Sequence, residues 1–260
     1  MKITFLGAGA AFTTQEYYQS NMLVTAASGK RLLIDCGTDI RHSLAEQGIH
    51  AGNIGAEIDA VYISHCHSDH IGGMEYFAFA SYFGGKRGAI KLFAEQDLLR
   101  KLWNESLKGG LGHIQGKSMQ MDEYFDCRPL SHNASFRWEE IDFQLVAMPH
   151  IVVDDEIIYS HGLLIGKTES EKYAAFISTD AQFRPDMISA IAQKVSVIFH
   201  DCETTPFKSV VHAHYDELRT LPAAVRNRMW LYHYQPDPVY EPEADGFKGF
   251  VKRGQEFYFD

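Results

Sequence analysis

The sequence predicts a single domain of mixed α and β structure, in the α+β class, spanning residues 1–260. Short runs of apolar and β-branched residues alternate along the chain with segments that have the spacing of amphipathic helices. Neither an internal repeat nor a low-complexity linker divides the chain. The composition, with 45% hydrophobic residues, is typical of a globular protein.

The N-terminal third predicts short strands followed by one helix. Residues 2–6 alternate as a strand, and the strands 22–26 and 31–34 are joined by a hairpin-like turn. The helix 38–47 is predicted from the spacing of Ile40 and Leu44.

The middle of the chain continues this alternation. An apolar strand over 59–64 precedes an aromatic-rich helix over 74–83, and a glycine-rich break separates that helix from a strand over 89–94. A helix follows over 96–107, and the glycine-rich, basic residues 108–117 predict a mobile surface loop.

In the C-terminal half, apolar runs predict five strands and helical spacing predicts two helices. The strands cover 141–147, 157–165, 173–178, 195–199 and 229–232. One helix covers 184–193, with Pro185 suited to its first turn, and the other starts at Asp216.

The densest cluster of metal-binding residue types follows the strand over 59–64. It contains His65, His67, Asp69 and His70, and His65 and His67 project to the same side if the backbone is extended. Such a pattern is expected by chance only about 0.002 times in a chain of this composition. Imidazole and carboxylate groups at one strand end therefore predict a site for a divalent metal ion.

Three further candidates lie at the ends of other predicted strands. They are His150, Asp180 and His233. Functional side chains collect at strand ends because loops leave a rigid platform there. His161 is a rival to His150, but it falls inside a predicted strand, so His150 is favoured. The remaining histidines, including His113 and His132, have no spacing that indicates a role.

These residues resemble the signature of the metallo-β-lactamase superfamily, HxHxDH followed by single later ligands. The segment that contains Asn21 and the sequence Leu-Ile-Asp-Cys-Gly over 33–37 is similar to the start of its RNase Z-like phosphodiesterase branch. The resemblance spans essentially the whole chain. It implies a four-layer αβ/βα sandwich, with two sheets face to face, helices outside and the site at one edge.

The resemblance also implies two divalent metal ions, with zinc favoured and Mn²⁺ or Fe²⁺ as alternatives. By analogy, one ion would be held by His65, His67 and His150. The other would be held by Asp69, His70 and His233, with Asp180 bridging the two. The ions would hold a hydroxide nucleophile, because metal coordination lowers the pKa of water to roughly 7.

A second group of residues suggests a proton donor. RNase Z-like phosphodiesterases carry a His-Glu dipeptide after a strand and a later histidine, and this chain has Asp201 and His212 at the corresponding places. We expect Asp201 to orient His212, which would protonate the leaving oxygen. His214 and Glu203 are the alternatives for these two roles.

The sequence therefore predicts a metal-dependent hydrolase, specifically a phosphodiesterase acting on a small or cyclic nucleotide. The alternatives are a tRNA 3′-processing endoribonuclease and a thioester or lactam hydrolase. A formal charge of -10 argues against an extended basic surface that binds nucleic acid electrostatically. Relatives that process tRNA carry a long basic arm, which we do not find. A homodimer is left open.

The start of the chain predicts a cytoplasmic location. Residues 1–7 enter a strand directly and lack the features of a signal peptide. No apolar run reaches the roughly 18 residues that a membrane-spanning helix needs. The four cysteines show no CxxC spacing, so they are expected to be free thiols.

Overall fold

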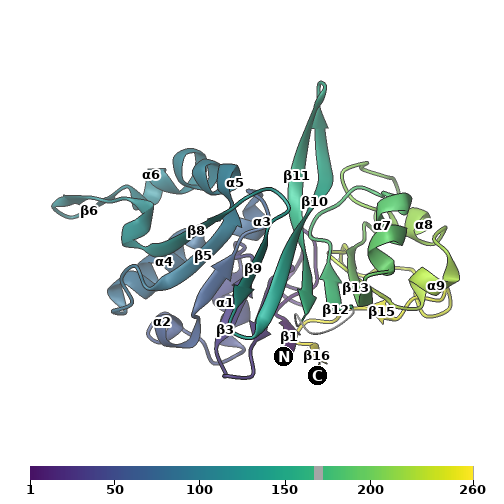
Figure 1. The fold of residues 1–260 in the computed structure, drawn as a ribbon, viewed down its shortest axis with the longest axis horizontal. Helices are drawn as coiled ribbons and strands as arrows, with labels where there is room; N and C mark the ends of the chain where they lie inside the picture. Colours follow the sequence, from purple (N-terminus) through teal and green to yellow (C-terminus); the bar gives the residue numbers. More distant parts are fainter. Residues whose placement is uncertain (167–171, 260) are drawn as a thin grey trace.

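Two mixed sheets packed face to face form the centre of the molecule, and helices cover both outer faces (Figure 1). The computed structural model describes residues 1–166 and 172–259. Within these residues each large sheet has seven strands. The predicted four-layer αβ/βα sandwich is confirmed.

The first sheet has the strand order β16-β1-β2-β3-β4-β5-β8. Its strands are β1 (Lys2–Phe5), β2 (Met22–Thr25), β3 (Arg31–Ile34), β4 (Ala60–Tyr62), β5 (Ile90–Glu95), β8 (Phe125–Leu130) and β16 (Glu256–Tyr258). The helices of this half are α1 (Ile40–Ala45), α2 (Ile54–Glu57), α3 (Ser68–Ile71), α4 (Met74–Phe83), α5 (Gln96–Lys101), the π-helix Leu102–Leu107, α6 (Lys108–Leu111) and the 3₁₀ turn Met121–Glu123.

The second sheet has the order β15-β14-β13-β12-β11-β10-β9. Its strands are β9 (Ser135–Trp138), β10 (Ile141–Val153), β11 (Glu156–Gly166), β12 (Tyr173–Ile177), β13 (Val195–Asp201), β14 (Met229–Tyr232) and β15 (Gly249–Phe250). Its outer helices are α7 (Pro185–Ala192), α8 (Tyr215–Leu218) and α9 (Ala223–Arg226).

Alternating side chains along the strands build three separate cores. On β3, Leu33 faces the helices α1–α6, while Leu32 and Ile34 face the opposite sheet. On β11, Leu164 faces the helices α7–α9, and its neighbours face the first sheet. Because successive side chains of a strand point to opposite faces, each sheet supplies one face to the middle core and one to a helical layer.

Parallel pairing brings the carboxyl ends of several strands to one edge of the sandwich. β3, β4 and β5 are parallel neighbours in the first sheet, as are β12, β13 and β14 in the second. The segments that leave β4, β12, β13 and β14 therefore emerge on the same side of their sheets. These segments contain most of the predicted site residues.

Several predicted elements match the structure, and one was wrong. The helix over 74–83 and the strand over 229–232 have the bounds expected from the sequence. Residues 108–117 do not form a loop throughout: they form α6 and most of a small hairpin of β6 (His113–Ile114) and β7 (Lys117–Ser118) that projects from the molecule (Figure 1). Leu111 is fully buried and anchors α6 in the core between the first sheet and its helices. The numbers of glycine and lysine residues in this segment could not reveal that contact.

The hairpin of β10 and β11 is also longer than predicted. Its tip stands clear of the sheet (Figure 1), and Val152 and Val153 near the turn are about half exposed. Among the described residues, no helix combines the length and apolar character needed to span a bilayer.

Candidate metal centre

The segment after β4 presents four of the candidate ligands. His65 and His67 lie on the extended backbone between β4 and α3, and Asp69 and His70 lie on α3 itself. His65 Nε2 and His67 Nδ1 are 3.1 Å apart, so the two rings do converge on one side. His65, Asp69 and His70 are buried.

A bulge in β10 places His150. The pairing of β10 with β11 shifts register between Pro149 and Ile151, which leaves His150 without a partner in the ladder. Bulges redirect a side chain locally and are common beside active sites. His150 Nε2 lies 3.1 Å from His67 Nδ1, so β10 contributes to the site from within its length and not from its end.

Asp180 and His233 reach the same place from the ends of β12 and β14. Asp180 Oδ2 lies 3.5 Å from His65 Nε2, and Asp180 Oδ1 lies 3.4 Å from His233 Nε2. His233 and Thr179, which precedes Asp180, have left-handed backbone with φ of 60° and 53°. Such conformations cost energy in non-glycine residues and cluster at functional sites.

Asp180 connects two sets of potential ligand atoms. The first set is His65, His67, His150 and Asp180, and the second is Asp69, His70, Asp180 and His233. Within each set the donor atoms all lie within 4.8 Å of one another. Four donors bound tetrahedrally to one zinc ion at 2.0–2.1 Å would lie about 3.3 Å apart, so the spacing suits a divalent ion in each set.

Unsatisfied buried atoms also indicate a missing ligand. Among the described residues, His70 Nε2 and Asp180 Oδ1 are buried and have no hydrogen-bond partner, although they face one another at 3.2 Å. Leaving such groups unpaired costs about 1–3 kcal/mol each. A cation between them satisfies both, and nitrogen and carboxylate donors are the ligands that zinc takes.

Hydrogen bonds behind the histidines turn the correct ring nitrogen toward the centre. His150 Nδ1 donates to the carbonyl oxygen of Val211 at 2.9 Å, and His70 Nδ1 donates to Asp35 Oδ2 at 2.7 Å. Each bond leaves Nε2 as a lone-pair donor that faces the site. Metal-bound histidines commonly have such outer partners.

Burial and charge divide the histidines of the site into two kinds. Burial lowers the pKa of His65, His67 and His150, which keeps these rings neutral. Burial also acts to lower the pKa of His70 and His233, but nearby carboxylates, Asp180 above all, outweigh it and raise both values. The second set contains two carboxylates, Asp69 and Asp180, whereas the first contains only Asp180.

Asp201 and His212 lie directly beside these sets, and with Asp180 and His233 they form a third group of potential ligand atoms. His212 Nδ1 donates to Asp201 Oδ2 at 2.8 Å, and Asp201 Oδ1 lies 3.3 Å from His233 Nδ1. Although burial lowers the pKa of His212, the charge of Asp201 and their hydrogen bond raise it above its ordinary value. Asp201 therefore orients both a candidate proton donor and a candidate ligand.

The alternatives for the proton donor and its orienting carboxylate, His214 and Glu203, make other contacts. His214 caps α8, where its ring accepts from the backbone N–H of Asp216 and its Nε2 donates to the carbonyl oxygen of Thr205. Glu203 accepts the backbone N–H of Ser209. Neither side chain belongs to the sets of potential ligands.

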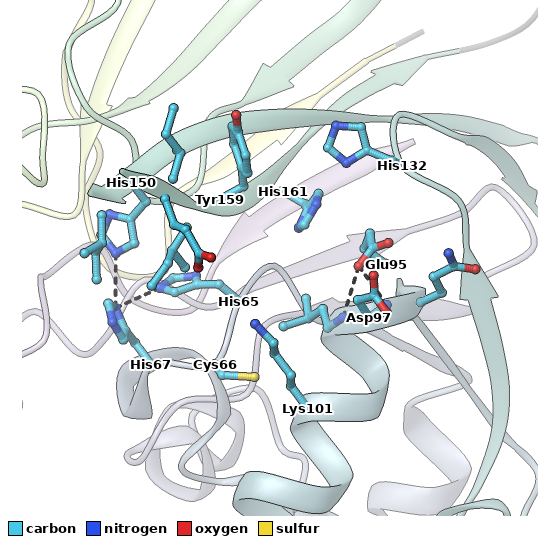
Figure 2. A pocket seen from close by; sticks show the side chains of 16 residues that line it. His65, Cys66, His67, Glu95, Asp97, Lys101, His132, His150, Tyr159 and His161 are labelled. Atoms are coloured by element: carbon cyan, nitrogen blue, oxygen red, sulfur yellow. Dashed lines mark hydrogen bonds between the residues drawn. The ribbon is translucent and has the colours of Figure 1, made fainter. Parts of the chain in front are cut away.

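A pocket of about 470 Å³ opens beside the first set of ligands (Figure 2). His65, His67 and His150 lie at one end of it, and Glu95 and Asp97 lie at the other. His161, His132 and Glu95 also line this pocket, although the spacing of these residues in the sequence indicates no role for them. Only the tertiary structure reveals this grouping, because the three residues come from β11, the loop before β9, and the end of β5.

Asp35 was also missed as an individual residue, although the motif that contains it was noted. Its Oδ1 accepts the backbone N–H of Ser64, and its Oδ2 accepts from the Ser64 hydroxyl and from His70. With φ of 61°, it leaves β3 in a left-handed conformation that aspartate tolerates better than most residues. Asp35 therefore holds the start of the ligand segment in place.

Solved structures share this fold. The metallo-β-lactamase fold protein YhfI from Bacillus subtilis aligns with a TM-score of 0.71, at 15% identity over 98% of each chain. A diphosphatase from the PhnP family aligns with a TM-score of 0.73, at 17% identity, covering 100% of this chain and 98% of the other. The short form of human tRNase Z, ELAC1, aligns with a TM-score of 0.69, at 16% identity over 99% of each chain. At these identities the likeness establishes the fold alone.

Sequence comparison is more specific. A protein described as Anti-Pycsar protein Apyc1 from Bacillus phage vB_BveM-Goe7 is 31% identical over 266 residues, covering 98% of this chain and 97% of the relative. A protein of the same description from Paenibacillus harenae is 34% identical over 236 residues, covering 90% of each chain. The family model described as Anti-Pycsar protein Apyc1 matches residues 1–257. The chain therefore belongs to the Anti-Pycsar protein Apyc1 family, on a metallo-β-lactamase fold.

Proposed function

We propose that this chain is a metal-dependent phosphodiesterase that opens the ring of a cyclic nucleotide, with a cyclic pyrimidine nucleotide as the substrate that family membership favours. The observation that carries the proposal is the position of Asp180 between two sets of histidines, with His212 alongside. The nitrogen and oxygen donor atoms of these sets are suited to binding a divalent metal ion.

We further propose that the site binds two metal ions, and that zinc is preferred over manganese or iron. The residues that would hold them are His65, His67 and His150 for one ion, Asp69, His70 and His233 for the other, and Asp180 for both. When bound, the ions would supply positive charge for the phosphate and a water of lowered pKa as nucleophile.

His212 would protonate the leaving oxygen. Its Nδ1 is held by Asp201, which leaves Nε2 free for a substrate, and its raised pKa favours the protonated ring near neutral pH. The His212 side chain is 19% exposed, so it can meet a ligand in the site. An alkoxide leaving group needs such an acid.

Processing of tRNA is less well supported. The pocket beside the first set of ligands has three carboxylates in its lining, on Glu95, Asp97 and Glu156, against one lysine, Lys101. An RNA chain would bring further phosphates toward this acidic wall. The projecting hairpin of β6 and β7 is short, and Lys117 on it is paired with Glu123.

Four other sequence predictions accompany this proposal. We propose that residues 1–260 form one domain, because both sheets share the middle core. We also propose a cytoplasmic location and a small nucleotide as the partner. A homodimer stays a prediction, which the mass of the purified protein in solution would test.

The first experiment is a substrate panel measured with and without chelator. It compares bis-p-nitrophenyl phosphate, 3′,5′-cyclic nucleotides, precursor tRNA and a thioester. We expect turnover of the first two classes, lost on chelation and restored by zinc or manganese. Cleavage of precursor tRNA alone, or turnover that chelation leaves unchanged, would contradict the proposal.

Replacing His212 by Ala tests the proton donor. General acid catalysis contributes about 10²- to 10⁴-fold, so kcat for a cyclic nucleotide should fall in this range while metal content stays normal. His113→Ala, on the distant β6, is the matched control. Unchanged turnover in the His212 variant would remove this residue from the mechanism.

A further inference from the structure

The pocket beside the first set of ligands has two chemically different ends. At one end lie the candidate metal ligands His65, His67 and His150, where a phosphate would bind. At the far end the wall is acidic and comes from α5 and the residue before it (Figure 2). Positive charge at one end and negative charge at the other would orient a nucleotide with its phosphate at the metals and its uncharged base toward α5.

Glu95 places a carboxylate in this far end. It is only 7% exposed, and its Oε2 accepts the backbone N–H groups of Asp97 and Leu98 at 2.8 and 3.0 Å. These bonds fix the carboxylate as the N-cap of α5. Glu95 lines the pocket, and the hydrogen bonds of its carboxylate within the described residues use only Oε2, so Oε1 is available to a ligand.

His161 supplies a second acceptor in the same pocket. It is 6% exposed, and its Nδ1 lies 3.3 Å from the carbonyl oxygen of Ser64. A carbonyl can only accept, so Nδ1 carries the proton and Nε2 of the neutral ring is an acceptor. Burial lowers the pKa of His161, although the hydrogen bond to Ser64 and the charge of Glu95 act against that shift.

The hairpin of β10 and β11 adds an apolar wall. Ile157, Ile158 and Tyr159 line the pocket, and each is between 37% and 45% exposed. Large apolar side chains left open beside a site suit the flat face of a base. The pocket therefore combines an apolar wall beside His150 with two buried hydrogen-bond acceptors toward its far end.

We propose that the far end of this pocket is a base subsite in which Glu95 and His161 accept hydrogen bonds from an amino group of the base. The chain would then prefer cytosine over uracil, which has the same size but carries a carbonyl oxygen at the position of the cytosine amino group. That oxygen would face acceptors and leave them unpaired. This inference rests on the proposed cyclic nucleotide activity and specifies its substrate.

Glu95→Gln tests the subsite with little change in shape. The glutamine oxygen can keep capping α5, which leaves the amide NH₂, a donor, facing the pocket. We expect the wild type to have a kcat/KM for cyclic CMP about tenfold or more above that for cyclic UMP. In the variant this ratio should fall to about one or reverse. A wild-type ratio near one, or a ratio that the substitution leaves unchanged, would overturn the subsite.

Asp97→Asn is the matched control, because it removes the same charge from the same end of the pocket. The Asp97 side chain is 71% exposed and lies 3.8 Å from Arg100, so we expect the ratio to stay at its wild-type value. An equal change in both variants would indicate a general charge effect and contradict the hydrogen-bond assignment.

Two more measurements keep the result interpretable. Hydrolysis of bis-p-nitrophenyl phosphate, which has no base, would show that Glu95→Gln still folds and keeps a working centre. If the wild type cleaves no cyclic nucleotide, the proposed function itself is contradicted. Calorimetry of the chelated protein should show that 5′-CMP binds more tightly than 5′-UMP even without metal. Equal affinities for the two nucleotides would count against the subsite.

His161→Asn provides a second variant if Glu95→Gln does not fold. The asparagine NH₂ can replace Nδ1–H toward Ser64, but the acceptor at Nε2 is lost. The preference for cyclic CMP should then weaken about tenfold. A preference kept in full would overturn the role of His161.

Discussion

At the scale of single residues, two buried carboxylates outside the proposed ligand set hold the candidate ligands in place. Asp35 orients His70 and also holds the backbone and hydroxyl of Ser64, the residue before His65. Asp201 in the same way touches His212 and His233. Both carboxylates are buried, so their charge has no solvent to compensate it and acts on the histidines.

Asp35→Asn should weaken metal binding about 10- to 100-fold, because the amide cannot accept all the hydrogen bonds that the carboxylate accepts. Competition with a chromophoric chelator would measure the zinc affinity. Asp126→Asn, at an exposed ion pair with Arg128, is the control and should bind zinc normally. Equal affinities in the two variants would show that Asp35 does not position His70.

At the scale of elements, α3 is held against the loop after β3 by close backbone contacts. A Cβ added at Gly73 would lie 2.3 Å from the carbonyl oxygen of Gly37, and one added at Gly37 would lie 2.1 Å from that of Asp69. Only glycine allows the two segments to approach so closely. This contact places Asp69 and His70 opposite the ligands of the second sheet.

Gly73→Ala should therefore displace α3, lower the free energy of unfolding by about 1–3 kcal/mol and reduce the bound metal. Urea denaturation and metal analysis would measure the two effects. Gly109→Ala is the control, since an added Cβ there would meet no atom within 4 Å. If both variants behave like wild type, the contact does not govern the position of α3.

At the scale of the whole molecule, the site joins the two sheets, because its side chains come from segments of both. Without metal, its histidines link stability to pH in opposite directions. The pKa of His65, His67 and His150 is lowered on folding, so their contribution is present above the ordinary value of 6.5 and is lost as pH falls below it. The raised pKa of His70 and His233 gives a contribution that is present below 6.5 and is lost as pH rises through the higher folded value.

The chelated protein should thus be most stable near pH 6.5 and less stable on either side. Urea midpoints at about pH 5.5, 6.5 and 8 would show this maximum. The same series with zinc present provides the comparison, because bound metal stabilises the fold wherever the ligands are deprotonated. Midpoints that change steadily in one direction across the chelated series would contradict the assignment of opposite shifts.

The sequence by itself determined the family, the fold and the segments that form the centre. His65, His67, Asp69 and His70 are close in the chain, so their spacing alone predicted a cluster, and strand ends pointed to Asp180 and His233. Which of these side chains hold metal stays a prediction. Local patterns can indicate such features because a strand end and a turn are decided by neighbouring residues.

Only the tertiary structure decided the features built from distant residues. The bulge at His150, the bond from His70 to Asp35 and the pocket that joins His161 to Glu95 all depend on contacts across strands or sheets. The same holds for β16, three residues near the C-terminus that pair with β1. Such contacts follow from how two sheets pack, and no local run of residues contains that information.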